Sequence, residues 1–336
     1  MKNEKIFYNA VANILGGDYK KINRLFTSKG TWENSFKSLG KNDELPQNLW
    51  RQLESLGVGL VLKGERDYPA LLGEIPLPPF GIYFLGNIPK VDEISLAIVG
   101  TRKVTPDGED LAHEFAKILA GRNINIISGL AFGVDSAAHR GALTAGRTCA
   151  VLATAVDNPT PATNKRLAEE ILAKGGALIS EYPPGSPAFA HRFLERNRIV
   201  SGLCRAVILI EAPERSGSLA TARFAMEQNR DVFVVPGPAV HRNYKGSHAL
   251  IREGARLATS AAEVLEDLGF SQKKISLFEG TPEEQTVLAT ITDLPNAGFD
   301  EIAETVKLDP ALLSQILNSL LIAEQIEETP NGYKII

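Results

Sequence analysis

Short apolar runs alternate with amphipathic segments through residues 95 to 268. The runs are rich in Ala, Val, Ile and Leu, which is typical of strands buried on both faces. They cover residues 96–99, 124–128, 149–153, 177–180, 207–211 and 232–235. Segments of about ten to fifteen residues with helical periodicity separate them, the spacing of βαβ units. The pattern predicts an α/β fold with a Rossmann-like, mostly parallel sheet covered by helices on both faces.

The segments on either side of this core, which we place at 86–268, have different patterns. Residues 1–85 show helical spacing with a turn at Gly16-Gly17, and prolines cluster near the end of this region. We therefore predict an N-terminal helical region. Residues 269–280 form a polar linker. Residues 281–336 begin with Thr281-Pro282 and predict three helices and a hairpin, a winged-helix-like domain.

Charge is segregated along the chain. The net charge is −4, but residues 281–336 hold two basic and ten acidic side chains, which leaves 34 basic and 30 acidic elsewhere. An acidic tail therefore follows a mildly basic body. The two cysteines, Cys149 and Cys204, lie in apolar runs and predict neither a disulfide framework nor a zinc cluster. With no signal peptide and no apolar run long enough to cross a membrane, we expect a cytoplasmic protein.

Glycine-rich polar loops follow three of the predicted strands. In an open parallel sheet, ligands bind outside the carboxyl ends of the strands. Small residues there let backbone amides approach an anion, and the next helix N-terminus favours negative charge. We interpret these glycine-rich loops as a binding site for a chain of phosphates. The alternative is that the glycines only form tight turns. The candidate residues are Gly100, Thr101, Arg102, Ser128, Gly129, Gly133, Ser216, Gly217 and Ser218.

Basic side chains add to these loops. Arg102 lies inside the first loop, Lys165 and Arg166 open the helix after the third strand, and Arg196, Asn197 and Arg198 precede the fifth strand. A guanidinium matches phosphate with a planar fork of donors. Structural salt bridges are the alternative for some of these groups. We expect Arg102, Lys165 and Arg198 to converge at one rim of the sheet.

Two common nucleotide motifs are absent from the sequence. The first βα turn lacks G-x-G-x-x-G, and no G-x-x-x-x-G-K-[ST] occurs, which disfavours NAD and a P-loop ATPase. We predict no cofactor, no metal and no catalytic residue. Asp135 and His139 lie one helical turn apart and could form a general-base pair. A helix-capping Asp and a packed, hydrogen-bonded His is the interpretation that we favour.

Several motifs together resemble the DprA/Smf family of DNA-processing proteins, over about residues 65 to 260. They are Gly100-Thr101-Arg102, the run from Ser128 to His139, Ser180-Glu181-Tyr182-Pro183-Pro184-Gly185, the run from Phe193 to Leu203, Glu211-Ala212, the run from Ser216 to Arg223, and Val235-Pro236-Gly237. The resemblance implies a Rossmann-like core that binds single-stranded DNA, forms a homodimer and helps load the RecA recombinase in natural transformation. It also implies an N-terminal region similar to SAM or helix-hairpin-helix domains and a C-terminal winged helix.

Two DNA contacts follow from the resemblance. The loop arginine of the family falls on Arg102, and its later basic residue falls on Lys165 or Arg166, after Asn164. The sequence departs from the family pattern at Thr160, where a Tyr is usual, at Ala155, where a Gly is usual, and at Leu194, where a Pro is usual. Any base stacking by the missing Tyr ring is therefore lost.

Two other functions remain as alternatives. A nucleotide N-glycosidase of a related Rossmann-like family needs a carboxylate soon after its glycine loop, and here none follows Ser218 until Glu227. A DNA-binding regulator would use its winged helix, whose recognition helix normally presents Lys or Arg. Residues 310–321 contain neither. We therefore expect the C-terminal domain to contact protein or to regulate the core.

Overall fold

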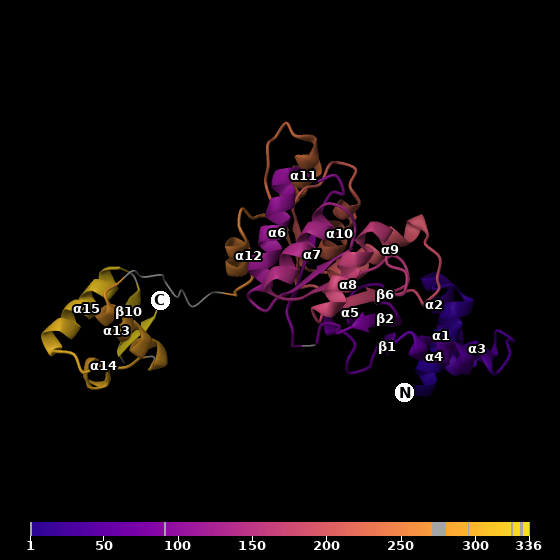
Figure 1. Cartoon of the computed structure of the whole chain (residues 1–336), viewed down its shortest axis with the longest axis horizontal. Helices are drawn as coiled ribbons and strands as arrows, with labels where there is room; N and C mark the ends of the chain where they lie inside the picture. The colour runs from indigo at the N-terminus through magenta and orange to yellow at the C-terminus, as the bar shows by residue number, and fades with distance from the viewer. Residues whose placement is uncertain are drawn as a thin grey trace. The chain divides into compact units, whose positions relative to one another are not determined.

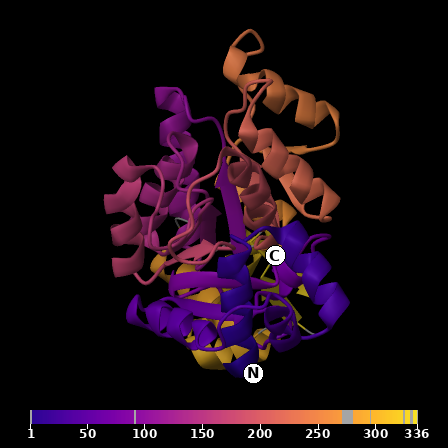
Figure 2. The same ribbon diagram turned by 90° about the vertical axis from the view of Figure 1, so that its right-hand side faces the viewer.

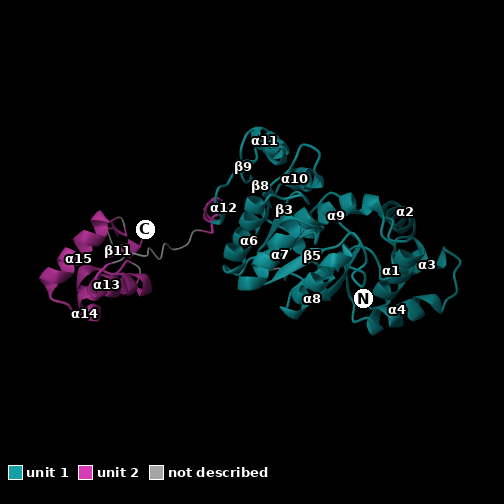
Figure 3. Ribbon diagram, turned by 45° about the horizontal axis from the view of Figure 1, so that its top comes forward, with its two compact units in different colours: residues 1–261 teal, residues 262–336 magenta. Residues whose placement is uncertain are grey.

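The computed structural model describes residues 2–90, 92–270, 280–294, 296–323, 325–329 and 332–335. The chain forms two compact units, Met1–Ala261 and Ala262–Ile336, coloured separately in Figure 3. The linker that we expect at residues 269–280 lies mostly outside the described residues, which stop at 270 and resume at 280.

A nine-stranded sheet forms the centre of the first unit (Figure 1). Its order is β1-β2-β6-β5-β4-β3-β7-β8-β9, and all neighbours from β6 to β9 are parallel. The strands are β1 (Gly59–Leu62), β2 (Gly81–Gly86), β3 (Ser95–Val99), β4 (Asn125–Ser128), β5 (Thr148–Val151), β6 (Ala177–Ser180), β7 (Ala206–Leu209), β8 (Asp231–Val234) and β9 (Arg256–Leu257). The predicted α/β fold with a mostly parallel sheet is confirmed.

Helices connect the parallel strands and cover both faces of the sheet. They are α6 (Pro106–Ala120), α7 (Val134–Ala145), η1 (Ala162–Asn164), α8 (Lys165–Ala173), α9 (Ala190–Gly202), α10 (Gly217–Glu227), η2 (Arg242–Tyr244) and α11 (Lys245–Arg252). The short α5 (Ala70–Gly73) lies between β1 and β2, and α12 (Ala261–Asp267) follows β9 along the chain. In Figure 2 the purple and rose helices of the first half of the core lie on one side of the sheet and the orange helices on the other.

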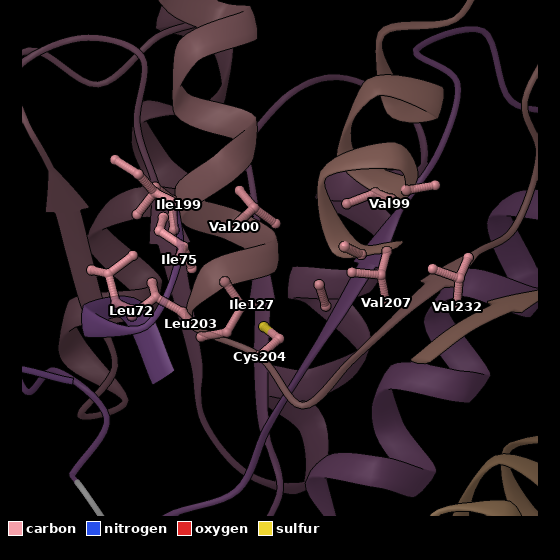
Figure 4. Packing of buried hydrophobic residues seen from close by; sticks show 14 of the residues in the cluster. Leu72, Ile75, Val99, Ile127, Ile199, Val200, Leu203, Cys204, Val207 and Val232 are labelled. Atoms are coloured by element: carbon pink, nitrogen blue, oxygen red, sulfur yellow. The ribbon is translucent and has the colours of Figure 1, made fainter. Parts of the chain in front are cut away.

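Alternate residues of each strand point into separate cores. On β5, Cys149 and Val151 face a cluster that α9 and α10 cover, whereas Ala150 faces a cluster that includes α8. Figure 4 shows the first of these clusters, in which Val200 of α9 and Leu203, directly after the helix, pack beside the strand residues. This packing fixes α9 on the sheet and thereby positions its polar side chains.

The prediction that residues 1–85 are helical is only partly correct. Four helices do form there: α1 (Lys2–Ile14), α2 (Tyr19–Lys29), α3 (Trp32–Lys37) and α4 (Leu45–Ser55). However, β1 and β2 add two antiparallel strands to the edge of the sheet, because β2 pairs with β6. The runs Leu60–Leu62 and 82–84 are apolar and bury most of their side chains, so tertiary pairing, not helical spacing, determines their structure.

Aromatic rings join the N-terminal helices to this edge of the sheet. The Tyr8 ring lies 4.9 Å from Trp32 and 6.3 Å from Tyr83 of β2, between ring centroids, and Trp32 lies 5.3 Å from Phe80. The N-terminal helices and the sheet therefore share one continuous core within the first unit.

The second unit contains the predicted three helices and hairpin. Its elements after α12 are α13 (Pro282–Asp293), α14 (Phe299–Val306), α15 (Pro310–Ile322), β10 (Ile326–Thr329) and β11 (Gly332–Ile335). Thr281 and Glu284 form a capping box at the start of α13. Residues 330 and 331, between the two strands of the hairpin, lie outside the described residues. The identity of this unit as a winged helix stays a prediction. Nowhere in the described ranges is a helix both long and apolar enough to cross a bilayer.

Candidate functional site

The order of the strands creates a switch point between β3 and β7. From β3 the chain adds parallel strands in one direction through β4, β5 and β6, and from β7 it adds β8 and β9 in the other. Loops at the carboxyl ends of β3 and β7 therefore diverge, and the crevice between them is the expected ligand site of such a sheet. A cavity of about 430 Å³ opens there. Loops after β3, β4 and β7 line it together with α9.

The loop after β3 brings a free guanidinium to the cavity. Gly100 packs so closely on Val134 that a Cβ would overlap it. The Thr101 amide donates to the carbonyl of Glu211 at 2.7 Å, which fixes the loop against the end of β7. Arg102 is exposed, lines the cavity and makes no ion pair among the described residues; its Cζ lies 5.4 Å from the ring centroid of Phe193.

The loop after β4 is held by its own polar groups. The Asp135 carboxylate accepts hydrogen bonds from the amides of Gly129 at 3.1 Å and Ala131 at 3.3 Å. Asn164 is buried and donates from Nδ2 to the carbonyl of Leu130 at 2.8 Å. Ser128 donates to the carbonyl of Ile98 at 2.7 Å. In this structure Ser128 and Asn164 thus shape the loop that lines the cavity.

The glycines of this loop are required by packing. A Cβ on Gly129 would overlap the guanidinium of Arg196, and one on Gly133 would overlap the carbonyl oxygen of Thr101. Gly133 also has a φ of 70°, which favours glycine. The tight-turn interpretation therefore explains these two glycines, although Gly129 also lines the cavity.

The loop after β7 brings the N-terminus of α10 to the cavity. Ser216 is the N-cap, and its Oγ accepts the amide of Ser218 at 3.3 Å. The amide of Gly217 has no hydrogen-bond partner in the described part of the chain, and a Cβ on Gly217 would meet open space. Arg215, just before the cap, is exposed and makes no ion pair among the described residues. The helix N-terminus and this guanidinium both favour an anion.

The two faces of α9 separate the arginines that the sequence places together. Because an α-helix turns about 100° per residue, Arg196 and Arg198 lie about 200° apart around the axis. Phe193, Arg196 and Val200 line the cavity on one face. Arg198 lies on the other face, where a second cavity begins, and Arg192, near the start of the helix, also lines that cavity.

Arg196 is buried and braces the cavity wall. Its Nη1 donates to the carbonyl of Gly129 at 2.7 Å and to that of Val151, and Nε donates to Asn197 Oδ1 at 3.3 Å. Burial lowers the pKa of Arg196, and the neighbouring Asp135 opposes this effect. Asn197 in turn donates to the carbonyl of Gly217 at 3.1 Å. These two side chains thus link the loops after β4, β5 and β7.

The expected convergence of Arg102, Lys165 and Arg198 is wrong. Arg198 Nη2 donates to both carboxylate oxygens of the buried Glu181, at 2.7 and 2.8 Å, so the salt-bridge alternative holds for this residue. Lys165 is exposed at the start of α8 and does not line the cavity. Arg166 pairs with Glu170 one turn later, at 3.0 Å. Arg102 and Arg196 both line the cavity together with the loops. Lys165 and Arg198 do not line it.

His139 is a packed residue, as favoured. It is fully buried, and its Nδ1 lies 2.8 Å from Thr148 Oγ1. Burial lowers the pKa of His139 to about 3, with smaller contributions from Arg196 and Arg140. Asp135 binds loop amides instead of this ring. The general-base pairing therefore has no support in the geometry.

Several residues that line the cavity are not among the predicted site residues, and Phe193, Leu194 and Arg215 are the most exposed or chemically active of them. Phe193 lies one helical turn before Arg196, so helical periodicity alone could have placed it on the same face. Arg215 directly precedes Ser216, the N-cap of α10, in one of the glycine-rich loops that the sequence predicts. Leu194, 54% exposed, lines both this cavity and the second one.

The fold and site define an α/β protein with a cationic cavity at the switch point of a parallel sheet. A family model described as DNA recombination-mediator protein A matches residues 59–269. The Smf protein of Escherichia coli (strain K12) is 38% identical over 295 residues, which cover 84% of this chain and 78% of that protein. The DNA processing protein DprA of Streptococcus pneumoniae (strain ATCC BAA-255 / R6) is 41% identical over 206 residues, covering 60% and 72%.

Two solved structures share the fold. The X-ray structure of DprA from Streptococcus pneumoniae has a TM-score of 0.62 at 36% identity and covers 70% of this chain and 80% of that one. DNA processing protein A from Helicobacter pylori, described with a single-stranded DNA binding mode, has a TM-score of 0.56 at 27% identity and covers 63% and 96%. The chain therefore belongs to the DNA recombination-mediator protein A family, and the resemblance seen in its motifs is confirmed.

Proposed function

We propose that this chain binds single-stranded DNA in the cavity between β3 and β7, without catalysing a reaction. The observation that carries the proposal is the pair of exposed guanidiniums, Arg102 and Arg215, beside the N-terminus of α10. Arginine forks and free helix amides both match phosphate oxygens. The half-buried Phe193 ring beside Arg102 offers a face on which a base can stack.

The single-stranded DNA binding of the Helicobacter pylori relative supports the same ligand here. We extend the proposal to the role that family membership suggests: a cytoplasmic homodimer that protects incoming DNA and loads RecA during transformation and recombination. A gel shift with RecA added in a second lane tests the loading step, and sedimentation at several concentrations tests the dimer.

A nucleotide N-glycosidase is the competing function. Among the described residues that line the cavity, Asp135 is the only carboxylic acid, and two loop amides already bind it. Oxocarbenium-like chemistry needs a carboxylate near the sugar. An assay for free base released from nucleoside monophosphates tests this alternative, and release of base would favour it.

Binding to single-stranded and duplex DNA, measured by fluorescence anisotropy, tests the main proposal. Arg102→Ala should weaken binding of the single strand by about 1–3 kcal/mol, as for a lost charge-assisted contact. Arg51→Ala, on exposed α4, is the control and should bind like the wild type. Equal binding by the Arg102 variant, or wild-type affinity that is indifferent to salt, would refute the proposal.

A further inference from the structure

A second, larger cavity lies on the opposite face of α9. Its volume is about 710 Å³, and it is bounded by the turn after α1, the start of α2 and the segment leading into α9. Figure 1 shows α2 beside this segment. All of these elements belong to the first unit. The exposed Leu194 lines both cavities, so they are neighbours along one surface.

The polar wall of this second cavity is internally satisfied. Glu181 binds Arg198, and Tyr182 donates from its hydroxyl to Glu195 at 2.8 Å. Arg192 is buried; it donates to the carbonyls of Pro187, at 2.9 Å, and Gly16. These contacts preorganise the wall, because Glu181, Arg192 and Arg198 are all held by protein partners.

The groups left open to a ligand are two aromatic rings and two leucines. The Phe189 ring is 44% exposed and stacks on His191, with 5.6 Å between ring centroids and 19° between planes. Arg192 lies over the same Phe189 ring, at 4.8 Å from its centroid. Leu77 and Leu194, 53% and 54% exposed, complete an apolar floor. A ring platform of this kind binds planar aromatic groups.

A row of positive charge lies beside the platform. Helix α2 carries Lys20, Lys21, Arg24 and Lys29 and no acidic residue. Lys21 pairs with Asp18, at 3.4 Å, whereas the other three make no ion pair among the described residues. Lys20 and Arg24 lie one turn apart on the same exposed face. Asp18 and Glu181 are ion-paired, so Lys20 and Arg24 outweigh Glu195, the one other carboxylate that lines the cavity among the described residues, and a polyanion meets excess positive charge here.

We propose that this cavity is a base-stacking subsite for single-stranded DNA, continuous with the first cavity across Leu194. The bases stack on the platform of Phe189 and His191, and the phosphates follow the basic face of α2. The combination of a flat ring platform and a cationic helix favours a nucleic-acid strand over an apolar peptide. The inference rests on the proposed function, because it requires that the strand also occupies the first cavity.

Oligothymidylates of two lengths test the subsite on the full chain. Lengths of about four and about twelve nucleotides fall at the lower and upper parts of the range for single-strand sites. Phe189→Ala should weaken binding of the longer strand about 5- to 100-fold, as for one lost stacked base, and leave the shorter strand unaffected. Phe189→Tyr keeps the ring and should restore binding. Leu56→Ala, at a site of similar exposure (47%), is the control.

The outcomes separate this inference from the proposed function. If Arg102→Ala weakens both strands but Phe189→Ala weakens neither, the subsite is refuted and the first cavity stands. If neither strand binds the wild type, the proposed function itself fails. Photo-crosslinking of wild-type protein to a longer strand carrying 5-iodouracil needs no variant. It should label the peptide containing Phe189 and His191, and labelling confined to Phe193 would overturn the subsite.

Discussion

Arg198 donates two hydrogen bonds from Nη2 to the Glu181 carboxylate, at 2.7 and 2.8 Å, on the face of α9 opposite the first cavity. Both side chains are buried, and Arg198 Nη1 also donates to the carbonyl of Glu195 at 3.2 Å. Within the Arg-Asn-Arg segment, one arginine therefore braces the first cavity and the other neutralises a carboxylate in the wall of the second.

Removing this arginine should destabilise the fold. Arg198→Met leaves Glu181 buried without its partner and should lower the free energy of unfolding by about 3–5 kcal/mol. Adding Glu181→Gln should recover much of that loss. Burial raises the pKa of Glu181 and Arg198 opposes the rise, so the single variant should be less destabilised at pH 5 than at pH 8, because protonation then removes the unpaired charge. Urea unfolding measures each value.

Arg24→Met, on an exposed helix, is the control and should change the free energy of unfolding by less than about 0.5 kcal/mol. A loss below about 1 kcal/mol for Arg198→Met would show that Glu181 does not need its ion pair with Arg198 to remain buried.

The sequence predicts the strands of the core well because each is a short apolar run between glycine or polar turns. It does not predict which strands are neighbours. The placement of β3 beside β7, which creates the cavity, depends on tertiary pairing of segments about 100 residues apart. Arg102, which the sequence places in a loop after a strand end, lines the cavity, and its role in binding stays a prediction.

The errors have physical causes too. Arg196 and Arg198 are neighbours in the sequence, but helical rotation directs them to opposite faces. Lys165 begins α8, away from the lining of the cavity, although its strand ends at the same edge. The strands β1 and β2 were missed because short apolar runs flanked by helices do not reveal whether a sheet edge is available to them.

His139 should make stability depend on pH. Its pKa of about 3 in the folded chain lies below its ordinary value of 6.5. Between these values the unfolded chain binds the proton and the folded chain does not. The contribution is therefore fully present above about pH 6.5 and is lost as pH falls, at up to about 1.4 kcal/mol per pH unit.

The test compares pH series of urea unfolding for the wild type and His139→Gln. The wild-type free energy of unfolding should decrease more steeply between pH 6.5 and pH 4.5 than that of the variant. The difference in slope should be up to about 1.4 kcal/mol per pH unit. Parallel curves would show that the pKa of His139 is the same in the folded and the unfolded chain, contrary to its burial against Thr148.

Arg215 should contribute one phosphate contact. Each contact with a single strand adds about 0.7 to the slope of log affinity against log salt concentration. Arg215→Ala should therefore reduce the magnitude of this slope by about 0.7 and weaken binding to all sequences alike. Anisotropy titrations over several salt concentrations give the slope. Arg223→Ala is a matched control, since Arg223 is exposed on the same helix but does not line the cavity. Equal slopes for the two variants would contradict the assignment.

The C-terminal unit should not be a DNA-binding module. Helix α15 has no Lys or Arg, and residues 281–336 hold two basic side chains against ten acidic ones. Val287, Ile302 and Leu317 are buried in a core of its own, so the fragment of residues 280–336 can be prepared separately. We expect this fragment to leave duplex DNA unshifted in a gel at physiological salt. A chain that ends at residue 270 should bind single-stranded DNA within about twofold of the full chain, because no phosphate contact is lost. Tight binding of duplex DNA by the fragment would restore the hypothesis of a DNA-binding regulator. A large loss of affinity for single-stranded DNA in the truncated chain would show that the C-terminal unit takes part in binding despite its negative charge.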